Sequence, residues 1–96
     1  MGIQELIGPC REEIMRLAAR YGVERVRVFG SFARGDAGAE SDLDLLVAFR
    51  DGRSLFDLIG FGQDVGDLLG REVDVVSERG VSPYLKDRIF AEAVPL

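Results

Sequence analysis

The most informative feature of this sequence is a glycine–serine pair that is followed, after a short interval, by two aspartates two positions apart. Gly30 and Ser31 end one β-like run, and Asp42 and Asp44 begin another. Alternate side chains of a strand lie on one face, so the two carboxylates are predicted to point the same way. Their repulsion is relieved by a divalent cation, and Mg²⁺ prefers carboxylate and phosphate oxygens. The pattern predicts a metal-dependent site for a phosphate-containing substrate.

A second metal ion would require a third carboxylate, and a later segment supplies one. Residues 72–76 alternate acidic and aliphatic side chains before a final valine, and Asp74 is the best candidate. Glu72 falls on the same predicted face, nearer the strand end, and is the alternative ligand. Two metal ions can stabilise the attacking and leaving oxygens of a phosphoryl-type transfer. We expect Asp42, Asp44 and Asp74 to converge on one cleft and to hold two Mg²⁺ ions, with Mn²⁺ as the alternative ion.

The glycine–serine pair is predicted to contact phosphate. Gly30 lets the backbone approach a phosphate closely, and free N–H groups at a helix start favour an anion. Ser31 is expected to begin a short helix that ends at Arg34 and to add its hydroxyl to the cradle. Arg34 either reaches the same anion or fixes the loop through Asp36 or Asp42, and the sequence leaves both options open.

Other interpretations of the two aspartates fit less well. Ser41 and Asp44 also match the helix-capping pattern S-x-x-[DE], but residues 43–49 are typical of a strand. A calcium loop requires further oxygen ligands at regular spacing, and position 46 is leucine. No Gly-Lys-Ser/Thr follows a glycine run, which excludes a P-loop.

Composition excludes several function classes. The net charge is −5 with no Lys/Arg stripe, so general nucleic-acid binding is not expected. The absence of histidine removes His-containing zinc sites and Ser-His triads, so any general base must be a carboxylate. Cys10 is the only cysteine, and its helical spacing with apolar neighbours favours a core thiol. With no signal peptide and no long apolar run, residues 1–96 are predicted to form one cytoplasmic domain that does not span a membrane.

Turn residues and periodicity predict the elements that position these side chains. Helices are expected at about 9–21, 31–34, 54–69 and from 82 onward, and strands at about 24–29, 42–49 and 72–76. The first two strands should be antiparallel neighbours, and the third, one helix later, should run parallel to the second. We therefore predict an α/β fold, or α+β by strict classification. It would have a small mixed sheet of about three strands, helices mainly on one face, and the metal site at the strand ends.

The helix expected at 54–69 carries two groups of apolar side chains. One group forms a stripe that suits a core-facing side. Its members are Leu55, Leu58, Phe61, Val65, Leu68 and Leu69. Phe56 and Ile59 lie outside the stripe. They either pack against the last helix or form a contact patch for a second copy of the chain or for a partner protein.

Two segments resemble a known family. The residues VFGSFARG from Val28 to Gly35, followed by SDLDLLV from Ser41 to Val47, resemble the G-S-x-A-R-G … S-D-[IVL]-D-[IVL] signature of the minimal nucleotidyltransferases, within the DNA polymerase β-like superfamily. The resemblance extends to residues 73–76 and to the closing residues 92–96. It implies the nucleotidyltransferase fold. The same resemblance implies metal-binding roles for Asp42, Asp44 and Asp74 and triphosphate contacts for Gly30 and Ser31.

By this resemblance, the chain transfers a nucleoside monophosphate from a nucleoside triphosphate, most often AMP from ATP, to an acceptor. The usual partner of prokaryotic members is a small helical toxic ribonuclease of the HEPN type, for which the nucleotidyltransferase acts as antitoxin. Two other functions stay open. The chain could be a non-catalytic binding module that silences a partner by contact alone, although a structural domain gains nothing from clustered acids. Transfer to a small molecule such as an aminoglycoside would require an acceptor pocket that so short a chain has little room to build.

Overall fold

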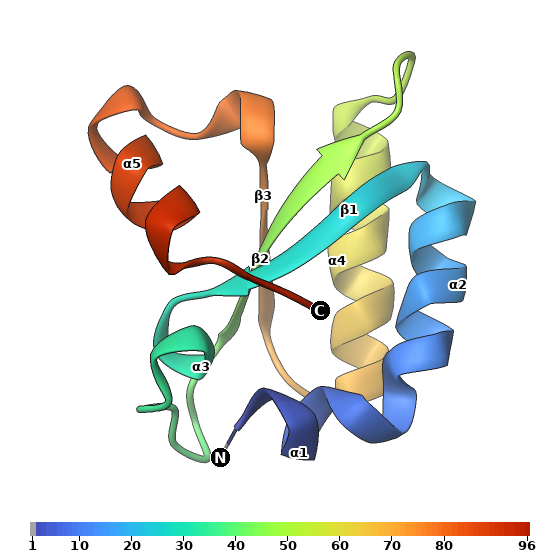
Figure 1. Cartoon of the computed structure of the whole chain (residues 1–96). Coiled ribbons are helices and arrows are strands. Elements are labelled where there is room, and N and C mark those ends of the chain that lie inside the picture. Colours follow the sequence, from blue (N-terminus) through green and yellow to red (C-terminus); the bar gives the residue numbers. More distant parts are fainter. Residues whose placement is uncertain (1) are drawn as a thin grey trace.

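A four-stranded mixed sheet forms the centre of the fold, in the computed structural model of residues 2–96 (Figure 1). The elements follow one another as α1 (Ile3–Ile7), the 3₁₀ turn η1 (Gly8–Cys10), α2 (Arg11–Tyr21), β1 (Val23–Phe29), α3 (Ser31–Arg34), β2 (Leu43–Phe49), α4 (Leu55–Leu69), β3 (Val73–Ser77), the 3₁₀ turn η2 (Glu78–Gly80), α5 (Pro83–Glu92) and β4 (Val94–Pro95). The strands lie in the order β3-β2-β1-β4.

The strand pairing agrees with the sequence-based expectation, except for the number of strands. β1 is antiparallel to β2, and β2 is parallel to β3 across the α4 connection. The predicted sheet of three strands is wrong by one, because Val94 and Pro95 form a short fourth strand that pairs antiparallel with β1. Two residues are too few to show an alternating pattern, and one of them is a proline. Only the pairing with Arg27 and Val28 identifies them as a strand.

The two faces of the sheet are covered by different helices. On one face α2 and α4 pack over the core, where Leu43, Leu45 and Val47 are buried. The alternate residues of β2 point to the other face. On that face Arg27 of β1 is the register partner of Leu46 of β2. The Arg27 guanidinium lies 4.9 Å from the ring centroid of a phenylalanine in α5. Helix α5 therefore covers the face that also carries Asp44.

Several predicted boundaries move by one or two residues. The helix expected at 9–21 is divided, since Pro9 lies in η1 and the α-helix itself begins at Arg11. Gly22 ends that helix in the left-handed region, with φ 73°. The second strand begins at residue 43 and not at 42, so Asp42 precedes it, and Glu72 likewise precedes β3. Cys10 is partly buried and packs against the core.

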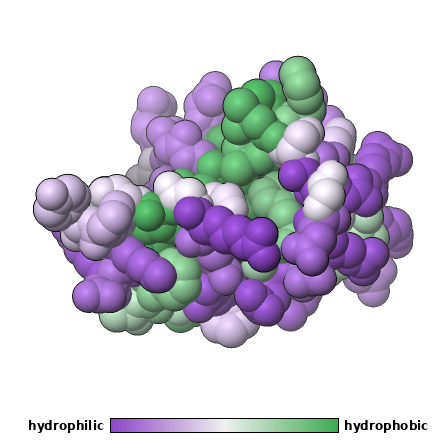
Figure 2. Space-filling view, turned by 90° about the horizontal axis from the view of Figure 1, so that it is seen from above, coloured by the Kyte–Doolittle hydropathy of each residue, from purple (hydrophilic) through white to green (hydrophobic). Residues whose placement is uncertain are grey.

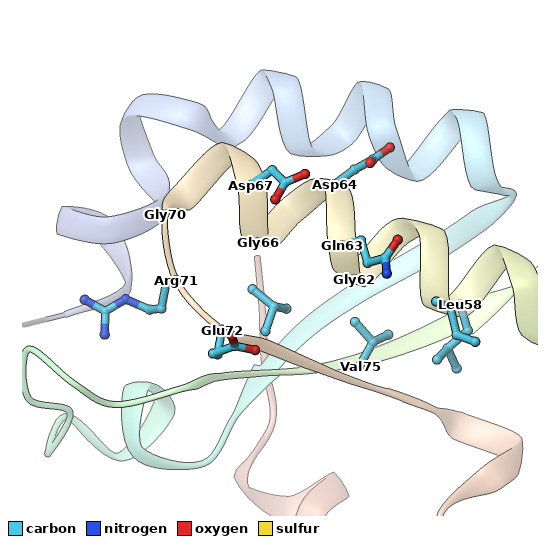
Figure 3. A pocket seen from close by; sticks show the side chains of 12 residues that line it. Leu58, Gly62, Gln63, Asp64, Gly66, Asp67, Gly70, Arg71, Glu72 and Val75 are labelled. Atoms are coloured by element: carbon cyan, nitrogen blue, oxygen red, sulfur yellow. The ribbon is translucent and has the colours of Figure 1, made fainter.

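Helix α4 begins with a capping box and packs closely against its neighbours at glycines. The Ser54 hydroxyl accepts the Phe56 N–H, and the Asp57 carboxylate accepts the Ser54 N–H at 2.9 Å. A Cβ on Gly62 would meet a methyl of the β3 valine at position 75 at 3.1 Å, and one on Gly66 would lie 3.0 Å from a backbone oxygen. The glycines weaken the isolated helix but allow it to approach β3 closely, which offsets that cost (Figure 3).

The first turns of α4 expose apolar side chains. Phe56 is 86% exposed and Ile59 is 46% exposed, so neither is buried within the monomer. The prediction that Leu55 faces the core is wrong: it is 68% exposed, because the sheet lies under later turns of the helix, where Phe61 and Val65 are fully buried. Figure 2 views the end of the molecule where α4 begins and shows apolar side chains gathered there beside polar ones. Within residues 2–96, no helix has the length and apolarity needed to cross a membrane.

Candidate functional site

The register of the sheet brings two of the predicted carboxylates side by side. Asp44 in β2 and Asp74 in β3 are paired positions of parallel strands, so their side chains leave the same face of the sheet. On its other side Asp44 is paired with Phe29, the last residue of β1, directly before Gly30. Asp42 lies two positions before Asp44, just outside the strand, and is exposed. The two acidic segments and the glycine–serine turn therefore meet at one end of the sheet.

Electrostatic crowding at this end is strongest at Asp44. The pKa of this carboxyl is raised from 3.8 to about 6, first by partial burial and then by the nearby charges of Asp74 and Asp42. The Arg34 guanidinium lowers the pKa of Asp44, and the Glu92 carboxylate raises it. The ionised site therefore carries an excess of negative charge that a bound cation would relieve.

The donor set suits a hard divalent cation in chemistry, but it is not gathered into a ready-made metal group. Among residues 2–96, no three side chains of His, Cys, Asp or Glu form a cluster that could hold a metal ion as they stand. Carboxylate oxygens are the ligands that Mg²⁺ and Mn²⁺ favour, and besides burial the charges of Asp74 and Asp42 raise the pKa of Asp44. Metal binding by Asp42, Asp44 and Asp74 therefore stays a prediction.

Glu72, the alternative third ligand, lies elsewhere. It lines an open groove of about 960 Å³ between α4 and β3, together with residues that include Val73 and Val75 of the core-facing side (Figure 3). Its backbone oxygen accepts the N–H of Leu43 at 3.0 Å. Because Asp74 acts on the pKa of Asp44 and is its register partner, the geometry favours Asp74 over Glu72 as the third carboxylate.

The Gly30–Ser31 turn is held against the carboxylates. Gly30 has φ 75° and ψ −152°, a conformation that L side chains rarely adopt. A Cβ at this position would also collide with the Asp44 carboxylate. Ser31 is the first residue of the short helix α3, as predicted, and it is partly buried. Close approach of the turn to Asp44 is the structural reason for glycine here.

Arg34 binds two carboxylates, and one of them was not predicted. Its Nε donates to Asp36 Oδ2 at 3.3 Å, which is one of the options that the sequence left open. Its Nη1 donates to Glu92 Oε1 at 2.9 Å. Glu92 is the last residue of α5, and the same oxygen accepts the backbone N–H of Gly30 at 2.5 Å. Sequence reasoning assigned Glu92 no role, although it belongs to the closing segment that carries the family resemblance.

Comparison with known proteins identifies relatives across almost the whole chain. The sequence model of the nucleotidyltransferase domain family matches residues 10–96. One relative is a Methanocaldococcus jannaschii protein named as a candidate protein adenylyltransferase. It is 41% identical over 88 residues, which cover 92% of this chain and 95% of that protein. A solved structure described as a candidate minimal nucleotidyltransferase is 50% identical, with a TM-score of 0.85, and covers 100% of this chain and 97% of the other.

A more distant structure shares the fold. It is a complex of a tri-AMPylated Shewanella oneidensis HEPN toxin with its MNT antitoxin, and the match has 20% identity and a TM-score of 0.66. The match covers 88% of this chain and 66% of the other.

Proposed function

Because the chain belongs to the nucleotidyltransferase domain family and its relatives are named protein adenylyltransferases, we propose that this nucleotidyltransferase transfers AMP from ATP to a partner protein. The reaction breaks the bond between the α- and β-phosphates, joins the α-phosphorus to a nucleophilic group of the acceptor, and releases pyrophosphate. The single observation that carries this proposal is the meeting of Asp44, Asp74 and the Gly30 turn at one end of the sheet.

Each group at this end has a defined task in the proposal. The N–H groups at the start of α3 and the Ser31 hydroxyl face the triphosphate, and the Arg34 guanidinium offsets part of its charge. Asp42, Asp44 and Asp74 would hold one or two divalent cations, Mg²⁺ or Mn²⁺. When bound, such cations neutralise phosphate charge and stabilise the leaving pyrophosphate. The close contact between Gly30 and Asp44 sets the spacing between the phosphate cradle and the carboxylates.

The acceptor is proposed to be a helical protein of the HEPN type, which the chain would modify and thereby silence as an antitoxin. The support is the shared fold with an MNT antitoxin whose HEPN toxin partner is AMPylated in the solved complex. The chain itself offers exposed apolar side chains at the start of α4 for such an association. A cytoplasmic location, where ATP is plentiful, fits this role.

The direct test is mass spectrometry of a co-purified HEPN-type partner after incubation with ATP and Mg²⁺. We expect the intact partner to gain the mass of one or more AMP groups with the natural chain. The gain should be lost with Asp44→Asn and kept with Asp87→Asn, a control at an exposed carboxylate of α5. A partner that is bound and silenced but never gains AMP would contradict the proposal and would favour a non-catalytic binding module.

A further inference from the structure

A single carboxylate oxygen ties the end of the chain to the nucleotide-facing turn. Glu92 Oε1 accepts the Gly30 N–H at 2.5 Å and an Arg34 N–H at 2.9 Å. The Glu92 side chain is 17% exposed, so this contact is largely withdrawn from solvent. Gly30 and Glu92 are 62 residues apart in the sequence. The contact therefore depends on how α5 and the last strand are packed, not on local structure.

Glu92 is held in place from both sides. It ends α5, and the next residue, Ala93, donates its N–H to the Ile89 carbonyl at 2.9 Å. Val94 then pairs with Val28 of β1, one residue before the strand ends. In Figure 1 the chain after α5 runs across β1. The Glu92 backbone is thus fixed by both a helix end and the sheet, and its carboxylate is held by Gly30 and Arg34.

The partners of Glu92 need such an anchor. Gly30 has a backbone conformation with φ 75°, and the turn lies against the Asp44 carboxylate, so a small shift would change the space between them. Arg34 also pairs with Asp36, but the Asp36 side chain is 62% exposed and this ion pair is therefore weak. Without Glu92, both the turn and the guanidinium would lose their best-protected hydrogen bond.

We propose that Glu92 is a positioning residue for the nucleotide site: it accepts the Gly30 N–H and directs Arg34, so that the start of α3 and the guanidinium face the triphosphate. This inference rests on the proposed nucleotide-binding function. It also assigns the Gly30 N–H to Glu92 and leaves the phosphate to Ser31 and Arg34. Glu92 itself does not touch the reacting atoms.

The test measures nucleotide binding without turnover. Binding of the non-cleavable analogue α,β-methylene-ATP with Mg²⁺ is followed by calorimetry for the natural chain, Glu92→Ala, Glu92→Gln and the control Asp87→Ala on the same helix. We expect Glu92→Ala to weaken binding at least about tenfold, the factor that corresponds to a charge-assisted hydrogen bond. Glu92→Gln keeps an acceptor oxygen and should stay within about threefold of the natural chain, and Asp87→Ala should not change binding.

An independent readout separates this inference from the proposed function. In the ligand-free protein, the amide proton of Gly30 should resonate downfield and move upfield in Glu92→Ala, whether or not nucleotide binds. Failure of the natural chain to bind the analogue would overturn the proposed function. Equal binding by a folded Glu92→Ala variant, with the Gly30 signal shifted, would overturn the positioning role. Tighter binding would also overturn it and would show that Glu92 competes with phosphate.

Discussion

Asp44→Asn is expected to stabilise the metal-free protein at neutral pH and to lose this effect in acid. The pKa of Asp44 is about 6 in the folded protein and 3.8 in the reference state. Between these values the folded state binds more protons than the unfolded state, so the contribution of Asp44 to stability is lost as the pH rises through about 6. The shift of about two units sets a ceiling of about 3 kcal/mol. Solvent screening of this half-buried group reduces the expected gain to about 1–2 kcal/mol.

The assay is urea unfolding in the presence of EDTA at about pH 7.5 and about pH 4.5. The natural chain is compared with Asp44→Asn and with Asp87→Asn, which removes an exposed carboxylate of α5. We expect a gain for Asp44→Asn at the higher pH, most of which disappears at the lower pH, and little change for Asp87→Asn at either. A loss of stability at about pH 7.5, or an equal gain at both values, would refute the link between charge crowding and the raised pKa of Asp44.

Three further predictions concern separate parts of the site and surface. Asp44→Asn should lower AMP transfer at least about 10²-fold in a labelled-ATP assay. Ser31→Ala should lower it less, because the backbone N–H at position 31 is retained. An equal or larger loss for Ser31→Ala would reverse these roles. Gly30→Ala should destabilise the protein by about 1 kcal/mol or more in thermal melts and impair transfer, because the added methyl group meets Asp44. Unchanged stability and transfer would contradict the close packing. Phe56→Asp combined with Ile59→Asp should leave the melting temperature nearly unchanged but abolish partner association in size-exclusion chromatography, whereas normal association would exclude this patch as the contact.

Local rules were sufficient for the part of the site that lies on neighbouring segments. Alternation of side chains along residues 43–49 places Asp44 on the face of the sheet away from the core. The antiparallel strand β1 brings the Gly30 turn beside Asp44. Ser54 and Asp57 predict the start of α4 because a capping box is formed by residues within one turn. These features depend on the alternation of side chains along a strand and on hydrogen bonds between residues close in sequence. Both can be predicted from a single sequence.

Features that depend on distant packing could not be predicted in the same way. The role of Glu92 follows from its contact with Gly30, and no local pattern indicates a bond across 62 residues. Strand β4 exists through its pairing with β1. The exposure of Leu55 was missed because helical periodicity identifies a face of α4 but not where along the helix the sheet begins. In each case tertiary contacts decide the outcome.

We propose that the carboxylates and the Gly30–Ser31 turn form one nucleotide and metal site. The most direct measurement is a crystal structure with α,β-methylene-ATP and Mn²⁺, in which anomalous scattering locates the ions. We predict Mn²⁺ peaks bound by carboxylate oxygens of Asp44 with Asp42 or Asp74, and triphosphate oxygens at the Ser31 end of α3. Nucleotide bound in the groove between α4 and β3, or Mn²⁺ peaks away from Asp44, would contradict this account.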